Sequence, residues 1–285
     1  MSRSVNQFTK AVVWFMLCIL VGCVTNALLK YLGATLNPWK ITFYRCFFST
    51  VVLLPIIYGR SASRVSVRSL GLHVVRGLVF ALAMSLWSYS LPKVPIALAI
   101  LINFTTPLFV LVLAPLMLNE QVTWHVWSAT TLAFLGIGAV LQPVQDFSLV
   151  SLLLVLASAL FGLLDVLNKK QLYRSSISAM LFYASFFATL FLTPAIFMPG
   201  PSPSYYEFGG LVLLGLGSNL LLYCLLRAFA LSSASSLAPF RYLELPVAAM
   251  IGYFFFREVP DSSIYLGAVV VIPCTLFALY HQQYT

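Results

Sequence analysis

Shifted by 139 positions, the second half of the sequence falls on the first. The matches under this shift include Lys30 with Lys169, Phe43-Tyr44 with Phe182-Tyr183, Phe47-Phe48 with Phe186-Phe187, Pro55 with Pro194, and Pro107 with Pro246. Towards the end the offset falls by one residue, so that Glu120 matches Glu258. The chain is therefore a duplication of one unit, and we predict the two copies over residues 1–143 and 144–285.

The repeated unit is too apolar for a soluble protein. Of the 285 residues, 61% are hydrophobic and 8% are charged, and the mean hydropathy is +0.98. A soluble globule of this size could not bury so much apolar surface, so the sequence predicts an all-α integral membrane protein. Duplicated membrane proteins are often transporters that hold their substrate between the two copies.

Breaks at glycine, proline and charged residues divide the chain into ten apolar segments, each near the roughly 20 residues that a membrane-spanning helix needs. The predicted segments are residues 10–29, 40–58, 69–91, 94–117, 124–141, 147–169, 176–196, 207–230, 233–256 and 262–281. Five segments in each half is an odd number, so the second half enters the membrane in the opposite direction from the first. The repeat is therefore predicted to be inverted.

The basic residues predict the orientation of the chain in the membrane. One side collects Arg3, Lys10, Arg60, Arg64, Arg68, Lys169, Lys170 and Arg174, whereas the other side collects Lys30, Lys40, Lys93 and Arg257. The positive-inside rule then places both termini in the cytoplasm. A cleaved signal peptide is disfavoured, because the first apolar run is longer than a typical signal h-region and its end belongs to the repeat.

The sequence contains no motif for catalysis, metal binding or a nucleotide cofactor. Cysteines 18, 23, 46, 224 and 274 lie in apolar stretches without paired spacing, and the three histidines are scattered. We therefore predict no enzyme activity, no cofactor, no metal and no nucleic-acid partner. The lipid bilayer is the expected surrounding, and the sequence is compatible with a monomer or a homodimer.

The matched prolines point to the middle of the membrane. Pro107 and Pro246 each remove the hydrogen bond to the carbonyl four residues earlier, at Asn103 and Tyr242. Such backbone is tolerated at this depth where it is buried in protein or lines a polar cavity. We expect a binding site there, with a simple packing kink as the alternative.

Beside Pro246, two ionisable residues stand in an apolar segment. Arg241 and Glu244 are three residues apart and can pair with each other. A purely structural ion pair is one interpretation, since buried pairs add little stability. We favour substrate binding, because ionisable groups inside a membrane usually mark transport pathways.

Other polar residues are predicted nearer the two mouths. Asn26 and Lys30 lie towards the outer end of the first segment, whereas Asp165 and Lys169 lie towards the inner end of the sixth. A gating role competes with lysines that merely snorkel to the headgroups. The same ambiguity applies to arginines near segment ends, namely Arg45, Arg76 and Arg227.

The charges break the symmetry of the repeat. Asp165 stands opposite Asn26, Arg241 opposite Ile102, Glu244 opposite Thr105, and Arg45 opposite Ala184. Residues 1–142 hold ten cations and one acid, net +9, whereas the remainder holds six of each, net zero. By this count Glu244 is the acid expected beside Arg241, and residues 233–256 are where substrate would be selected.

In these features the chain resembles the EamA branch of the drug/metabolite transporter superfamily. The resemblance rests on the ten-helix inverted duplication and on the segment ends Leu118-Asn119-Glu120 and Phe256-Arg257-Glu258. Four motifs are also similar to those of the S-adenosylmethionine uptake transporters of obligate intracellular bacteria: DVLNKK at 165–170, SAMLFY at 178–183, APFRYLE at 238–244 and GAV at 267–269.

The resemblance implies import of S-adenosylmethionine across a bacterial cytoplasmic membrane, in exchange for S-adenosylhomocysteine, by alternating access. Glu244 would hold the ammonium or sulfonium, Arg241 the carboxylate, and Asn103 with Trp87 or Tyr242 the adenine. The full candidate substrate-binding set is Glu244, Arg241, Tyr242, Asn103, Trp87, Phe104, Asp165 and Tyr183. The candidate gating or pathway set is Asn26, Lys30, Lys169, Arg45 and Arg227. An EamA-type exporter of amino acids or of cationic metabolites and drugs is the alternative.

Overall fold

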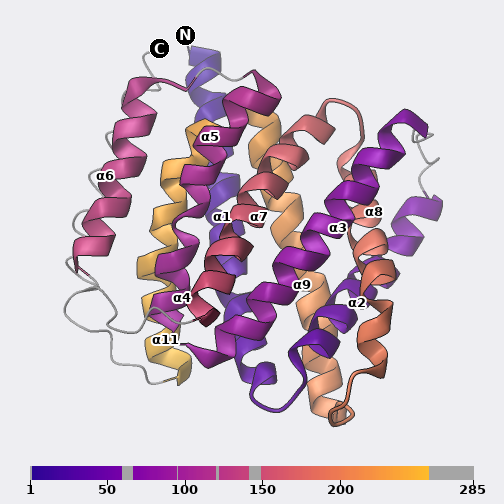
Figure 1. Cartoon of the computed structure of the whole chain (residues 1–285). Helices are drawn as coiled ribbons and strands as arrows, with labels where there is room; N and C mark the ends of the chain where they lie inside the picture. Colours follow the sequence, from indigo (N-terminus) through magenta and orange to yellow (C-terminus); the bar gives the residue numbers. More distant parts are fainter. Residues whose placement is uncertain (1, 60–66, 95, 120–121, 141–148, 257–285) are drawn as a thin grey trace.

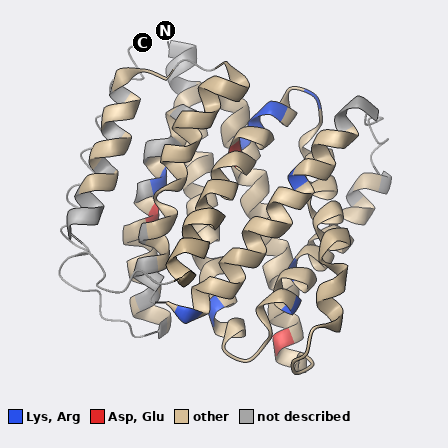
Figure 2. Cartoon of the chain, viewed as in Figure 1, with Lys and Arg blue, Asp and Glu red and all other residues tan. Residues whose placement is uncertain are grey.

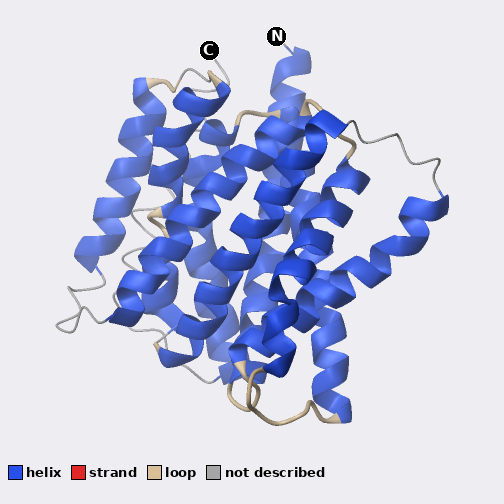
Figure 3. Cartoon of the chain, turned by 45° about the vertical axis from the view of Figure 1, so that its right-hand side comes forward, coloured by secondary structure: helices blue, strands red, loops and turns tan. Residues whose placement is uncertain are grey.

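The computed structural model of the chain describes residues 2–59, 67–94, 96–119, 122–140 and 149–256. These residues form helices joined by turns, with no strand among them (Figure 3). The α-helices are α1 Ser2–Gly33, α2 Pro38–Gly59, α3 Val67–Ser90, α4 Ile96–Asn103, α5 Thr106–Leu118, α6 Trp124–Val140, α7 Leu149–Leu172, α8 Ile177–Leu192, α9 Tyr205–Leu231, α10 Ala234–Leu237 and α11 Glu244–Phe256. Short 3₁₀ turns are η1 Leu91–Lys93, η2 Thr193–Phe197 and η3 Ala238–Leu243.

The all-helical membrane architecture predicted from the sequence is confirmed. Five helical stretches are long and apolar enough to cross a bilayer: Gln7–Gly33, Leu70–Lys93, Leu149–Leu172, Ile177–Phe197 and Tyr205–Leu231. Figure 2 shows few charged residues along the middle of the bundle and more of them towards its two ends. The predicted segment at 262–281 lies outside the described residues.

Local signals set several helix ends. Ser204 caps α9 by accepting a hydrogen bond from the Glu207 backbone amide, while the Glu207 carboxylate accepts from the Ser204 backbone amide at 2.8 Å. Ser176 caps α8 through the Ala179 amide at 3.3 Å. At the end of α5, Asn119 adopts a left-handed conformation with φ of 55°, a common way for a helix to stop.

Two of the predicted segments are each divided in the structure. The segment at 94–117 is interrupted at Phe104 and Thr105, between α4 and α5. The segment at 233–256 becomes α10, the 3₁₀ turn η3, and α11. The prolines fit these breaks, because Pro107 and Pro246 fall in the first turns of α5 and α11, where a missing amide hydrogen costs nothing.

The two halves pack on each other in matching pairs. Helix α1 packs against α9 as α7 packs against α3, and α2 packs against α9 as α3 packs against α8. Between α2 and α8, the hydroxyls of Thr50 and Thr189, which are 139 residues apart, meet at 3.3 Å. A residue that contacts its own counterpart marks a two-fold axis between the copies. In Figure 1, α1 and α7 cross the bundle in opposite directions.

Two glycines permit the closest of these helix crossings. A Cβ on Gly215 of α9 would lie 2.7 Å from the Phe48 Cβ and 2.8 Å from the Ser49 backbone nitrogen of α2. A Cβ on Gly77 of α3 would lie 2.4 Å from the Phe187 Cβ of α8. Small residues at such contacts let membrane helices approach closely, which brings the side chains of α2, α3, α8 and α9 together.

We expect Gly215→Ala to destabilise the protein by about 1–3 kcal/mol, because the clash is with backbone that a side-chain rotation cannot relieve. Gly209→Ala on the same helix is the control, since a Cβ there meets nothing within 4 Å. Thermal unfolding of the purified variants in detergent measures both. Equal melting temperatures for the two variants would contradict this account of the α2–α9 crossing.

Candidate substrate site

A cavity of about 170 Å³ lies between the two copies. Its walls come from α1 to α4 in the first copy and from α7, α8, α9, η3 and α11 in the second. The polar lining consists of Thr25, Asn26, Arg45, Ser49, Arg76, Asn103, Asp165, Asn168, Ser185, Ser218, Asn219, Arg241 and Glu244. The aromatic lining consists of Phe15, Phe80, Trp87 and Phe161.

Many lining residues are counterparts under the repeat. Pairs that are 139 positions apart and both line the cavity are Gly22 with Phe161, Thr25 with Leu164, Asn26 with Asp165, Arg45 with Ala184, and Phe80 with Asn219. The cavity thus spans the axis that relates the copies. Within each of these pairs the residue types differ, so a symmetric scaffold encloses an asymmetric set of charges.

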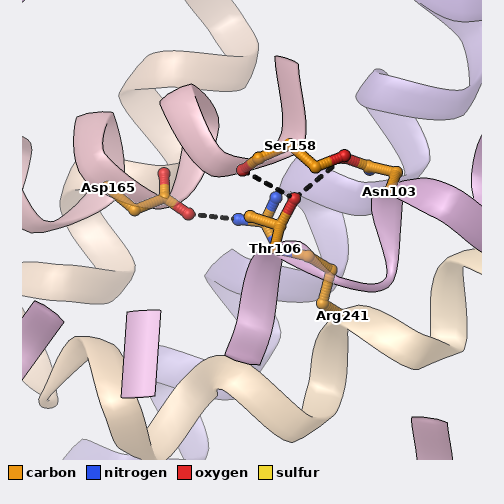
Figure 4. Close-up of polar contacts among 5 residues, drawn as sticks. All are labelled: Asn103, Thr106, Ser158, Asp165 and Arg241. Atoms are coloured by element: carbon orange, nitrogen blue, oxygen red, sulfur yellow. Dashed lines mark hydrogen bonds and ion pairs between the residues drawn. The ribbon is translucent and has the colours of Figure 1, made fainter. Parts of the chain in front are cut away.

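Arg241 pairs with Asp165, which corrects the pairing expected from the sequence. The Arg241 Nη2 atom donates to Asp165 Oδ2 at 2.5 Å, joining η3 to α7 (Figure 4). Glu244, three residues away, was the possible partner considered from the sequence, but Arg241 reaches from the 3₁₀ turn across to α7 instead. Two acids, Asp165 and Glu244, therefore line the cavity with Arg241, and both were among the candidate substrate-binding residues.

Glu244 is the carboxylate that the cavity leaves available. Its residue is 8% exposed, and within the described part of the chain its carboxylate has no hydrogen bond or ion pair. It is the first residue of α11, where the positive end of the helix dipole favours a negative charge. A buried charge of this kind needs a partner or water, and a cationic ligand would supply one.

Arg45 occupies another part of the wall. Its Nε atom donates to the Ser218 hydroxyl of α9, which in turn donates to the Leu214 carbonyl at 2.7 Å. One turn after Arg45 on α2, the Ser49 carbonyl accepts a hydrogen bond from Asn219 of α9 at 2.9 Å. This bond joins the same two helices. Arg45 is buried at 4% exposure, and its Nη1 atom has no hydrogen-bond partner among the described residues.

Arg76 and Asn168 line the cavity but were not in the predicted site. Arg76 donates to Asn168 Oδ1 through Nε at 2.8 Å and Nη2 at 2.6 Å, and its Nη1 lies 3.1 Å from His73 Nδ1. Arginine can only donate, so His73 accepts at Nδ1. In sequence Arg76 stands near a segment end, which made snorkelling as plausible as a site role. Asn168 gave no comparable signal.

The break between α4 and α5 is held by hydrogen bonds to α7. The Thr106 hydroxyl donates to Asn103 Oδ1 at 3.0 Å and also reaches the Ser158 carbonyl at 3.3 Å (Figure 4). The Ile102 carbonyl, beside the break, accepts from the Thr105 hydroxyl at 2.7 Å and from the Thr105 backbone amide at 3.0 Å. Asn103 itself lines the cavity. The predicted link between a broken helix and a polar cavity is therefore present here.

Asn26 and Asp165 lie in the same cavity rather than at opposite mouths. Trp87 donates its indole Nε1 to Asn26 Oδ1 at 3.2 Å, and its ring packs edge-on against Phe161 with centroids 6.1 Å apart. The sequence placed these residues correctly along their helices. It did not show how deep the cavity reaches, because depth depends on how α1, α3 and α7 pack.

The remaining candidates do not line the cavity. Phe104 is fully buried in the core around α1 and α9, and Tyr183 packs on His73 with ring centroids 5.0 Å apart. Lys169 donates to the carbonyls of Phe229 and Ser232, which caps the end of α9. Arg227 is exposed and lies beside the rings of Trp14 and Tyr223. Lys30 is half-buried and does not line the cavity. The Tyr242 side chain lies outside the described residues.

Hydrogen bonds join the two copies at each end of the bundle. At one end, Asn37 donates to the Pro199 carbonyl at 2.9 Å and Lys40 to the Gly200 carbonyl at 3.1 Å, linking the α1–α2 turn to the turn before α9. At the other end, His73 of α3 donates from Nε2 to the Ser175 hydroxyl at 3.2 Å, because its Nδ1 accepts from Arg76, and Gln171 Nε2 donates to the same hydroxyl at 2.8 Å. Hydrogen bonds between the two copies therefore link the helices on both sides of the cavity.

Known proteins are similar to this chain in sequence or in fold. The sequence profile of the EamA-like transporter family matches the chain twice, over residues 9–142 and 148–280. A protein of Rickettsia prowazekii (strain Madrid E) named S-adenosylmethionine uptake transporter is 36% identical over 286 residues, covering 99% of this chain and 97% of that protein. A solved crystal structure of 16% sequence identity superposes with a TM-score of 0.76, covering 95% of this chain and 96% of its own, which shows a shared fold.

More distant relatives carry other names. A riboflavin transporter of Brucella anthropi is 29% identical and covers 84% of this chain and 87% of its own length. The pseudopaline exporter CntI of Pseudomonas aeruginosa is 27% identical and covers 87% of this chain and 88% of its own length. Since the family profile matches both halves and the Rickettsia protein aligns over nearly the whole length, this chain belongs to the EamA-like transporter family.

Proposed function

We propose that this chain imports S-adenosylmethionine across the bacterial cytoplasmic membrane, in exchange for S-adenosylhomocysteine. The observation that carries the proposal is Glu244, a buried carboxylate in the cavity wall that has no hydrogen bond or ion pair among the described residues. Relatives named S-adenosylmethionine uptake transporter support this choice of substrate, at 36% identity over 99% of the chain.

The ligand and the cavity are chemically matched. S-adenosylmethionine carries a sulfonium, an ammonium, a carboxylate and an adenine ring. Carboxylates and aromatic faces attract sulfonium and ammonium groups, and Glu244 shares the cavity with Phe15 and Trp87. A flat ring such as adenine packs well between aromatic side chains, which Phe80, Phe161 and Trp87 supply. The Asn103 carboxamide adds a group that can hydrogen-bond to an adenine edge.

Transport would proceed by rocking of one copy against the other around this fixed site. The hydrogen bonds at the two ends of the bundle then act alternately, one set opening while the other holds. On the positive-inside rule, both termini and the α7–α8 turn face the cytoplasm. The Asn37 and Lys40 contacts would close the outer mouth, and the His73, Gln171 and Ser175 contacts would close the inner one.

An exporter of amino acids or cationic metabolites is the second candidate. The 27% identity to the pseudopaline exporter favours considering it, and the same cavity would serve either direction. Substrate binding separates the two candidates, because an exporter of other compounds has no reason to bind S-adenosylmethionine selectively.

We expect S-adenosylmethionine to stabilise the purified protein. A ligand at about 100 times its dissociation constant adds roughly 2.7 kcal/mol to the free energy of unfolding. A thermal-shift panel would compare S-adenosylmethionine, S-adenosylhomocysteine, aromatic amino acids and quaternary amines. Stabilisation by the first two supports the proposal. Stabilisation by the amino acids or amines alone would favour the exporter and overturn the import of S-adenosylmethionine.

A further inference from the structure

The cavity wall contains a cationic side chain, that of Arg45, to which the proposed function assigns no role. Arg45 lies in its wall at 4% exposure, and its guanidinium is fixed from one side by the Ser218 hydroxyl of α9. Within the described residues, its Nη1 atom has no hydrogen-bond partner. A buried guanidinium nitrogen without an acceptor is costly, so the site favours a ligand that brings an acceptor of negative charge.

Arg241 is less suited to bind an anionic group of the ligand. Its Nη2 atom already donates to the Asp165 carboxylate at 2.5 Å, so its charge is compensated inside the protein. Arg76 is similarly engaged, since Nε, Nη1 and Nη2 all meet Asn168 or His73. Of the three arginines in the lining, Arg45 is the one with a fully buried guanidinium nitrogen that lacks an acceptor among the described residues, and no acid pairs with it there.

A second unused donor faces the same space. Asn168 is 1% exposed and lines the cavity, and Arg76 holds its Oδ1 atom through two hydrogen bonds. This arrangement leaves the Asn168 Nδ2 amide without an acceptor among the described residues. Both orphan groups are donors, so each fits an acceptor on the ligand and neither fits an ammonium.

We propose that Arg45 binds the carboxylate of the substrate, opposite Glu244, which binds its cationic group. This assignment rests on the proposed function and deepens it, because it makes the cavity selective for ligands that carry an α-amino acid. The counterpart of Arg45 in the repeat is Ala184, which also lines the cavity, so the positive pole is on one side only. The Asn168 amide would donate to another acceptor of the same ligand.

The test compares S-adenosylmethionine with its decarboxylated form, which keeps the sulfonium, the amine and the adenine. Dissociation constants would be measured by calorimetry on the purified full chain and on Arg45→Gln and Arg45→Lys. Arg174→Gln is the matched control, because Arg174 is an exposed arginine in the α7–α8 turn. Charged hydrogen bonds predict that the wild type binds the carboxylate form about 10- to 100-fold more tightly.

We expect Arg45→Gln to bind both ligands equally, at the wild-type affinity for the decarboxylated form. Arg45→Lys, which keeps the charge but loses the planar fork, should keep part of the preference. If Arg45→Gln does not fold, the comparison of Arg45→Lys with the wild type tests the assignment instead. Arg174→Gln should keep the full preference.

Two results would overturn the assignment. One is a wild type that binds both ligands equally, and the other is an Arg45 variant that keeps the whole preference. Failure of the proposed function looks different, since the wild type would then bind neither ligand. In that case the role of Arg45 in binding this carboxylate would be refuted together with the proposed function.

Discussion

Replacing Glu244 with Gln will reduce uptake of S-adenosylmethionine by about 100-fold, the usual scale for losing one partner of a buried charge pair. The carboxylate is buried at the start of α11, lines the cavity, and has no hydrogen bond or ion pair among the described residues. Glutamine has the same shape but no charge, so folding should be retained while attraction for a sulfonium or ammonium is lost. Uptake of labelled substrate into proteoliposomes, normalised to the amount of reconstituted protein, measures the effect.

Glu207→Gln provides the comparison for removal of a carboxylate outside the cavity. Glu207 is exposed at the start of α9, where it accepts hydrogen bonds from Ser204 and Thr35. Glutamine can still accept from the Ser204 amide in the capping box, so stability should change little and uptake should stay near the wild-type rate. Wild-type uptake by Glu244→Gln would refute the role proposed for Glu244.

Asp165→Asn will destabilise the protein by about 3–5 kcal/mol, because it leaves the charge of Arg241 buried without its partner. The two side chains meet at 2.5 Å with 17% and 8% of their side-chain surfaces exposed. Arg241→Gln should be milder, since an isolated aspartate can take up a proton whereas a guanidinium remains charged. The double variant Asp165→Asn with Arg241→Gln removes both charges and should recover most of the lost stability.

Thermal unfolding of the wild type, both single variants and the double variant forms a double-mutant cycle for this pair. Strong coupling of the two substitutions is the expected result. Simple addition of the single effects would contradict a direct ion pair between α7 and η3. Substrate binding by the double variant gives an independent readout, because the inference that Arg45 binds the carboxylate predicts that this variant still prefers the carboxylate form.

Much of the fold follows from the pattern of residues along the chain. Apolar runs of sufficient length become helices because, in lipid, the backbone must satisfy its hydrogen bonds within each segment. Pro107 and Pro246 mark the two helix breaks, since neither can donate a backbone hydrogen bond. The cavity-facing positions of Asn26, Arg45, Trp87, Asn103, Asp165, Arg241 and Glu244 were all among the candidates named from the sequence.

The roles within the cavity were harder to infer. Spacing along the chain suggested Glu244 as the partner of Arg241, whereas the structure gives Asp165, which is 76 residues away. Arg76 and Asn168 entered the lining only through the packing of α3 against α7. Phe104 and Tyr183 do not belong to the site, because Phe104, in the break between α4 and α5, is buried in the core, and Tyr183 packs on His73.

The sequence by itself determined the duplication, the helical membrane architecture, the two prolines beside the cavity and the residues that carry charge. Only the tertiary structure decided which charge is compensated and which remains available. Hydrophobic length and proline act locally, so they can be read from consecutive residues. Charge pairing acts across helices: the packing of η3 on α7 compensates Arg241, whereas the crossing of α2 with α9 leaves the Nη1 atom of Arg45, a lining residue, buried without an acceptor among the described residues.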